Sequence, residues 1–132
     1  NQQPVIFALS NPTSKAECTA EQAYLWSQGR AVFASGSPFP ALDYEGKTLH
    51  PAQGNNAYVF PGVGLGVITC GASRVTEEMF LNAAAVLAEA VDEDRLQSGS
   101  VYPPLSQIRS ISLHIAVAVA ECAYAQNLAS VP

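Results

Sequence analysis

The feature that most constrains this chain is a pair of short apolar runs separated by one helix-length segment. The runs are Val5–Leu9 and Ala31–Ser35. A continuous apolar run, unlike an alternating one, predicts a strand that is covered on both faces, as in a parallel sheet. The intervening segment Thr19–Gln28 opens with the capping-box pattern Thr-Ala-Glu-Gln and stops at Gly29, which predicts a helix. Together these elements predict adjacent parallel strands joined by one helix.

The segment after the second run is less regular. Phe39–Gln53 shows no clear period, and only a turn at Glu45-Gly46 is expected there. The chain would then contain two strands and four or five helices. Because two strands make a poor sheet by themselves, we expect an α/β fold. It would be the trailing part of a doubly wound, Rossmann-like domain, with parallel strands and flanking helices, whose first strands are absent from this chain.

Three further helices are expected. The apolar stretch Tyr58–Cys70 has Pro61 in a position that suits a first helical turn. An amphipathic helix is expected to start at Thr76, and Ser110 is expected to cap a last, almost entirely apolar helix that ends near Gln126. Glycines inside the first of these helices would each cost about 1 kcal/mol if they were exposed. We therefore expect close packing against other backbone at three glycines: Gly62, Gly64 and Gly66.

Composition limits the classes of protein to consider. A length of 132 residues allows one compact domain, and 48% hydrophobic with 13% charged residues is too apolar for disorder. The net charge of −5, with scattered Lys and Arg, argues against a nucleic-acid surface. The longest uninterrupted apolar run, Ile115–Ala120, is too short to span a membrane.

The cysteines and the first residue bear on cellular context. Cys18, Cys70 and Cys122 are far apart and form no C-x-x-C pattern. We expect three reduced, mostly buried thiols in an intracellular protein, and neither a disulfide nor a metal framework. The chain opens at Asn1 without Met or a signal peptide and enters a strand almost at once. This favours a start within a longer protein, although processing could also produce it.

Polar residues that follow the predicted strands are the candidate binding residues. In open parallel sheets, ligands bind beyond the carboxyl ends of the strands. Asn11 follows the first strand, and Asn55 and Asn56 precede a helix that could bring them to the same edge. An Asn amide both donates and accepts hydrogen bonds, so it suits a carboxylate or an amide without adding charge. Alternatively, Asn11 is only a turn residue and one of the pair is only an N-cap.

Other candidates are weaker. The spacing Gly62-x-Gly64-x-Gly66 is not that of a phosphate-binding loop and follows no strand. His50 and His114 have no partner histidine nearby in the sequence. The acidic run Asp92–Asp94 is better explained as a solvated helix start than as a metal cluster. Lys15 and Lys47 are expected at the surface, and Ser35 and Ser37 lack the nucleophile-elbow pattern. The residues therefore indicate a ligand-binding face but no complete catalytic set.

Five long motifs occur in order along the whole chain. They are VIFALSNPTS at 5–14, AECTAE at 16–21, FASGSPF at 33–39, NNAYVFPG at 55–62, and YPPL at 102–105 followed by IRSIS at 108–112. With these motifs the chain resembles the malic enzymes. The resemblance implies oxidation of L-malate with NAD or NADP and decarboxylation to pyruvate and CO2. It also implies a divalent Mg or Mn ion, with a lysine and a tyrosine as general base and acid.

The resemblance assigns only part of the site to this chain. It implies that Asn11 contacts both malate and the nicotinamide end of the cofactor. It also implies that Asn55 or Asn56 holds a malate carboxylate, with Asn55 slightly favoured. The family's catalytic Tyr and Lys, acidic metal ligands, malate-binding Arg and G-x-G-x-x-G loop all precede the matched region. No catalytic residue and no metal ligand is therefore expected among these 132 residues.

Residues 1–132 are thus expected to be the C-terminal portion of a malic enzyme NAD(P)-binding domain, inactive alone and part of a longer chain. The alternative is a non-catalytic regulatory or binding domain that kept the fold. The implied partners are L-malate and pyruvate, with no nucleic acid and no membrane. A homo-oligomer, either a dimer or a tetramer, is also expected. The expected location is the cytoplasm, with an organelle matrix as the alternative.

Overall fold

The computed structural model describes all residues from 1 to 132 and divides them into two compact units. Unit 1 consists of Asn1–Asn55 and Val91–Tyr102, and unit 2 of Asn56–Ala90 and Pro103–Pro132. The length predicts one compact domain, whereas the chain forms two compact units. Each unit has its own secondary structure and is described by itself.

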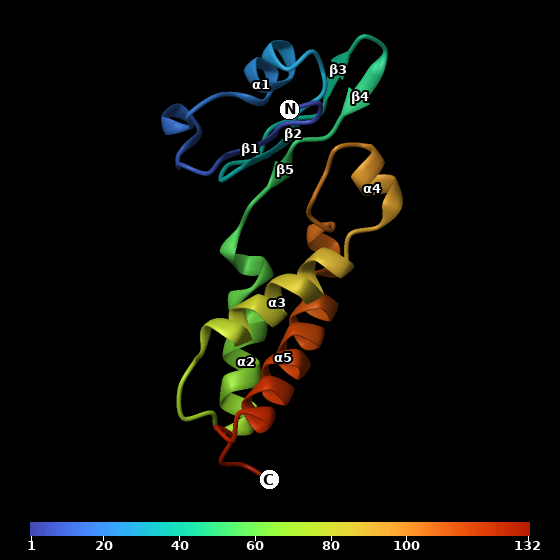
Figure 1. Cartoon of the computed structure of the whole chain (residues 1–132). Helices are drawn as coiled ribbons and strands as arrows, with labels where there is room; N and C mark the ends of the chain where they lie inside the picture. Colours follow the sequence, from blue (N-terminus) through green and yellow to red (C-terminus); the bar gives the residue numbers. More distant parts are fainter. The chain divides into compact units, whose positions relative to one another are not determined.

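Unit 1 is built on a three-stranded parallel sheet (Figure 1). Its strands are β1 (Val5–Ala8), β2 (Val32–Ser35) and β5 (Ala52–Gln53), with β2 in the middle. β1 and β2 pair in parallel from Val5 opposite Val32 to Ala8 opposite Ser35. The two apolar runs are therefore adjacent parallel strands, as predicted. The expectation of only two sheet strands is wrong, because β5 adds a third strand that pairs with β2 through two residues.

Helix α1 (Ala20–Trp26) connects β1 to β2, and its start is specified by the sequence. Both halves of the predicted capping box are present. The backbone N–H of Gln22 donates to Thr19 Oγ1 at 3.1 Å, and the Thr19 N–H donates to Gln22 Oε1 at 2.9 Å. The helix ends two residues before the expected Gln28. It ends there because Gln28 and Gly29 adopt left-handed φ values of 57° and 71°.

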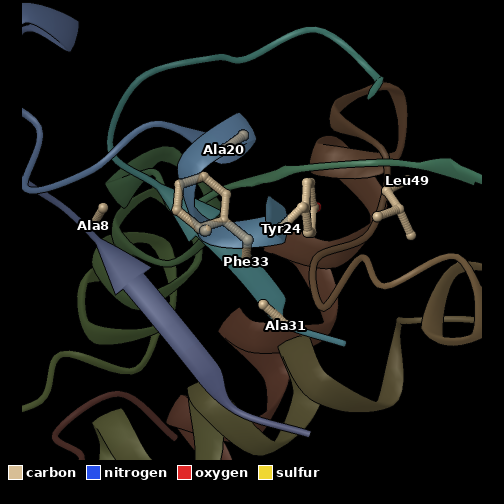
Figure 2. Close-up of a cluster of buried hydrophobic side chains, with 7 residues drawn as sticks. Ala8, Ala20, Tyr24, Ala31, Phe33 and Leu49 are labelled. Atoms are coloured by element: carbon tan, nitrogen blue, oxygen red, sulfur yellow. The ribbon is translucent and has the colours of Figure 1, made fainter. Parts of the chain in front are cut away.

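The core of unit 1 lies between α1 and the sheet. Figure 2 shows the rings of Tyr24 from α1 and Phe33 from β2 among small buried side chains. The ring centroids of Tyr24 and Phe33 are 6.1 Å apart in an edge-to-face arrangement. The Tyr24 hydroxyl is buried and has no hydrogen-bond partner. Desolvation raises the pKa of Tyr24 to about 12.

The segment expected to be irregular contains a β-hairpin, so that expectation is wrong. β3 (Leu42–Tyr44) pairs antiparallel with β4 (Lys47–Leu49). The predicted turn at Glu45-Gly46 joins them with φ values of 49° and 81°. Positive φ at both central residues matches the twist of a two-residue hairpin. Strands of three residues are too short to show a hydrophobic period, which is why the pattern hid them.

The acidic run begins the short helix α4 (Glu93–Gln97), which completes unit 1. The Asp92 carboxylate accepts a hydrogen bond of 2.8 Å from the Arg95 N–H, so Asp92 is the N-cap. The chain then turns at Gly99, whose φ is 83°. The expectation that the acidic run is a solvated helix start is confirmed, because Asp92, Glu93 and Asp94 are all exposed.

Unit 2 is a layer of three helices: α2 (Phe60–Cys70), α3 (Glu77–Glu89) and α5 (Ile108–Ala125) (Figure 1). Short 3-10 turns precede α2 and α5, namely η2 (Asn56–Tyr58) and η3 (Leu105–Gln107). A third such turn, η1 (Thr13–Lys15), lies in unit 1. Helix α5 packs against both α2 and α3. Helix α3 starts where predicted, and Thr76 is its N-cap, because the Thr76 Oγ1 accepts from the Met79 N–H at 3.4 Å.

Two of the three α2 glycines allow close packing against α5. A Cβ placed on Gly62 would lie 2.7 Å from the Ile115 side chain, and one on Gly66 would lie 2.6 Å from the carbonyl oxygen of Ala116. The prediction of close packing is confirmed at these two positions. It is wrong at Gly64, where a Cβ would meet no atom within 4 Å.

Helix α5 begins earlier than predicted. It starts at Ile108 directly after η3, so Ser110 lies inside the helix and does not cap it. The residue before η3, Pro104, is extended, and the helical turn is already formed when the chain reaches Ser110. The expectation that Ser110 caps the helix is therefore wrong.

Helix α5 is covered on one side within this chain. Ile115 and Val119 are fully buried, whereas Leu113 and Val117 are 57% and 49% exposed. By length and composition alone, Leu105–Ala125 could cross a membrane, although no apolar run in it is long. This is weak evidence, because the core helix of a globular domain passes the same test.

The cysteines are all free thiols. Cys70 and Cys122 are buried and Cys18 is partly buried, as expected for mostly buried thiols. Desolvation raises the pKa of both Cys18 and Cys122. Their low thiolate fraction at neutral pH makes them poor nucleophiles.

Candidate functional site

The carboxyl ends of the three parallel strands define one edge of the unit 1 sheet. β1 leads to Asn11, β2 leads to the turn Ser35–Ser37, and β5 leads to Asn55. Since all three strands run in the same direction, these residues follow the same edge. This is where open parallel sheets bind ligands.

The turn after β2 is bonded to both neighbouring strands. The Gly36 N–H donates to the Ala8 carbonyl of β1 at 3.1 Å, and the Gly54 N–H donates to the Ser35 carbonyl at 2.9 Å. Gln53 Nε2 also donates to the Gly36 carbonyl at 3.4 Å. The turn therefore ties the segment that carries Asn11 to the segment that carries Asn55.

The side chain of Asn11 is held in one orientation. Its Oδ1 accepts a hydrogen bond of 2.7 Å from Ser37 Oγ, which belongs to the turn after β2. Asn11 itself is exposed, and its peptide bond to Pro12 is cis. Its Nδ2 makes no hydrogen bond within the chain. The amide thus keeps two N–H donors for a ligand.

Of the two asparagines, Asn55 follows β5 and therefore lies at the same sheet edge as Asn11, which follows β1. Asn55 comes two residues after β5 and is exposed. Asn56 belongs to unit 2, where it begins η2 and its carbonyl accepts from the Val59 N–H at 3.1 Å. The N-cap of α2 is Val59, with no side chain bonded to it. Neither Asn is therefore the N-cap residue of α2 itself.

A carboxylate lies beside the turn that carries Asn11. Ser10 Oγ donates a short hydrogen bond to the Glu17 carboxylate, and the Ser10 N–H donates to the same group at 3.4 Å. The Ser10 hydroxyl is the main cause that lowers the pKa of Glu17, so Glu17 remains ionised at neutral pH. The bonds from Ser10 anchor the start of the turn to the segment before α1.

The remaining sequence candidates do not form a second site. Asp92 serves as a helix cap, and no three His, Cys, Asp or Glu side chains come together anywhere in the chain. His50 and His114 are exposed, as are both lysines. Gly62 lies against the side chain of Ile115, so its role is in packing and not in a phosphate-binding loop.

Sequence reasoning missed two parts of this edge. The first is β5, which is only two residues long. The second is the bond from Ser37 to Asn11, which joins residues 26 positions apart. The placement of Ser37 just after the second apolar run was a usable signal, because the ends of adjacent parallel strands lie close together.

A short parallel sheet that presents amide donors at its carboxyl edge is typical of the nucleotide-binding domain of an α/β enzyme. The family model described as "Malic enzyme, NAD binding domain" matches residues 1–124. The chain therefore belongs to the malic enzyme family.

Individual relatives agree with the family match. The chain is 58% identical to an NADP-dependent chloroplastic malic enzyme of Zea mays, 61% to an NADP-dependent malic enzyme of Anas platyrhynchos and 56% to one of Vitis vinifera. Each alignment covers 98% of this chain but only 20%, 24% and 22% of the respective relative. The chain thus spans about a fifth to a quarter of their length.

Proposed function

We propose that the protein carrying this chain oxidises L-malate with NADP and decarboxylates the product to pyruvate and CO2. The observation that supports this most strongly is the identity of 56% to 61% with NADP-dependent malic enzymes over nearly the whole chain. The names of the relatives favour NADP.

The chain's contribution to the reaction is the donor edge of unit 1. A nicotinamide cofactor held at this edge would supply the hydride acceptor for malate oxidation. Asn11 offers Nδ2 to an acceptor at this edge, because its Oδ1 is already bound to Ser37. A malate carboxylate and the carboxamide oxygen of nicotinamide are both suitable acceptors. The Asn11 amide binds either acceptor as an uncharged donor.

The second amide of the site is Asn55 or Asn56, and the structure favours Asn55. It follows β5 directly, and the Gly54 N–H just before it is bonded to the Ser35 carbonyl. The placement of its backbone is therefore tied to the same turn that holds Asn11. We assign to it the second contact with a malate carboxylate.

The metal and the acid-base pair belong to other parts of the protein. This chain brings together no three His, Cys, Asp or Glu side chains. We assign the metal ligands, the general base and the general acid to residues outside these 132, as the resemblance implies. The chain by itself is expected to be inactive.

The test is to assay the full-length protein for malate-dependent NADPH formation together with pyruvate release. We expect both products in equal amounts with added Mg or Mn, and a higher kcat/KM with NADP than with NAD. The isolated 132-residue chain should form neither product. A full-length protein that binds NADP or malate but forms neither NADPH nor pyruvate would support the alternative, a non-catalytic binding domain.

A further inference from the structure

Ser37 holds the Asn11 side chain in place at the sheet edge. Ser37 is only 8% exposed, and its own backbone N–H is bonded to Ser35 Oγ at 3.3 Å within the turn. Ser35 is fully buried in β2. The Ser37 side chain is therefore held in place, and its hydroxyl donates a bond of 2.7 Å to Oδ1 of Asn11 from that position.

An exposed Asn side chain can present either its oxygen or its nitrogen, because rotation about χ2 exchanges the two. The bond from Ser37 Oγ to Oδ1 holds the amide in place with Nδ2 toward the ligand. Because a hydroxyl also accepts, this bond fixes where the amide lies, and the ligand determines which of its two groups faces it. A carboxylate has only acceptor oxygens and binds an N–H group well. In the opposite orientation, Oδ1 would face the carboxylate and repel it.

Gly36 limits the Asn11 side chain from the other side. A Cβ placed on Gly36 would lie 2.8 Å from Nδ2 and 3.0 Å from Oδ1 of Asn11. The amide thus lies directly against the backbone of the turn, where no larger residue would leave room for it. The Ser35-Gly36-Ser37 turn supplies both the space for the amide and the bond that orients it.

We propose that Ser37 is a positioning residue, which holds the Asn11 amide in place at the sheet edge so that its nitrogen can bind a substrate carboxylate. The inference rests on the proposed function, since it assumes that Asn11 binds malate. It goes further by assigning the placement of that amide to a residue that does not itself contact the substrate.

The experiment is a double-mutant cycle in the full-length protein, with Ser37→Ala, Asn11→Ala and the double variant. Steady-state kinetics with malate and thermal unfolding are measured on each. Ser37→Ala alone should raise the KM for malate about five- to tenfold with a smaller change in kcat, since the lost interaction is one of ground-state binding. In the Asn11→Ala background the same substitution should change KM less than about twofold, because no amide remains to be oriented.

The matched control is Thr48→Val, which removes another hydroxyl in the same unit. Thr48 Oγ1 donates to Asp43 Oδ1 at 2.7 Å, the same length as the Ser37 bond, but it lies in the β3–β4 hairpin. We expect the control to leave the KM for malate unchanged. If Ser37→Ala does not fold, Ser37→Cys replaces it in the cycle, because the thiol keeps the volume but is a weak donor.

The outcomes separate this inference from the proposed function. If Asn11→Ala leaves malate kinetics unchanged, the assignment of Asn11 to the malate site is wrong, and the inference falls with it. If Asn11→Ala impairs the enzyme but Ser37→Ala does not, only the positioning role is overturned. An equal effect of Ser37→Ala in both backgrounds would also overturn it, because a purely structural residue acts independently of Asn11.

Discussion

Glycine serves different purposes in the two units of this chain. In unit 2, Gly62 and Gly66 let α2 approach α5, and an added Cβ at Gly66 would press on backbone and on Val119. In unit 1, an added Cβ at Gly36 would press on the Asn11 side chain and on the carbonyl of Leu9. The same chemical change therefore threatens packing in one unit and a candidate binding residue in the other.

This difference teaches that a glycine has to be interpreted by what its missing side chain would touch. Where the neighbours are apolar side chains and helix backbone, the cost of substitution appears in stability. At Gly36 the neighbours are a backbone carbonyl and an exposed amide with a free donor, so the cost appears in binding as well as in stability. Measuring both stability and kinetics on the same variants turns this contrast into a test.

The largest expected effect is the loss of Asn11. Asn11→Ala should lower kcat/KM for malate about ten- to a few-hundredfold, because one or two hydrogen bonds to a charged group contribute about 1.5–3 kcal/mol each. The melting temperature should change little, since a turn Asn on the surface loses few contacts. Steady-state kinetics and thermal unfolding of the full-length protein check both statements. Normal kinetics with a lowered melting temperature would mean that Asn11 is only a turn residue.

The same measurements apply to Asn55→Ala and Asn56→Ala. We expect the larger loss of kcat/KM, about tenfold or more, at Asn55, since it follows β5 at the sheet edge. Asn56 provides the matched control, with the same side chain one residue further along. A larger kinetic loss at Asn56 would reverse this assignment.

Gly36→Ala should reduce kcat/KM for malate by up to about a hundredfold, because a displacement of a binding group by about 1 Å can have an effect of that size. Gly66→Ala should instead lower the stability of the folded protein by about 1–3 kcal/mol through overpacking against α5. We expect its KM for malate to stay at the wild-type value. If both variants lost only stability, the functional reading of Gly36 would be wrong.

Tyr24→Phe tests the unpartnered hydroxyl in the core of unit 1. The folded pKa of about 12 lies above the ordinary value of 10, so the unfolded state ionises first as the pH rises. Below pH 10 the ionisation of Tyr24 therefore does not affect the free energy of unfolding. Between about pH 10 and 12 it lowers the free energy of unfolding by about 2 kcal/mol. Unfolding followed against pH should show a shallower alkaline decline in Tyr24→Phe. A parallel decline in both proteins would show that Tyr24 titrates normally.

The smallest expected effect is at Gly64. A Cβ there meets no atom within 4 Å, so alanine should gain helix propensity without overpacking. Gly64→Ala should stabilise the protein by up to about 1 kcal/mol. It is also the matched control for Gly66→Ala, two residues away on the same helix. A loss of stability at Gly64 would mean that another part of the full-length protein covers this position.

The elements with strong local signals were predictable from the sequence. The apolar runs specify β1 and β2, and the pairs Thr19–Gln22 and Thr76–Met79 specify two helix starts through local bonds. The prediction at Ser110 was wrong although its hydroxyl suits a cap. The turn η3, which follows the extended Pro104, leads directly into α5 at Ile108, two residues before Ser110. A capping side chain therefore sets the start of a helix only where the preceding residues are not already helical.

The site was only half predictable for a similar reason. The position of Asn11 after a strand could be derived from one short segment. The bond that orients it comes from Ser37, and the strand that carries Asn55 is formed only by pairing with β2. Both depend on contacts between distant segments, and a pattern along the chain does not report such contacts.

The two-residue strand β5 leads to Asn55. Its alignment with β2 rests on two pairs, Ala34 with Ala52 and Ser35 with Gln53. A slip of one residue would reverse which side chains face each way. The bonds from the Gly54 N–H to the Ser35 carbonyl and from Gln53 Nε2 to the Gly36 carbonyl continue this alignment toward Asn55. The placement of the Asn55 backbone therefore depends on the pairing of only two residues of β5 with β2.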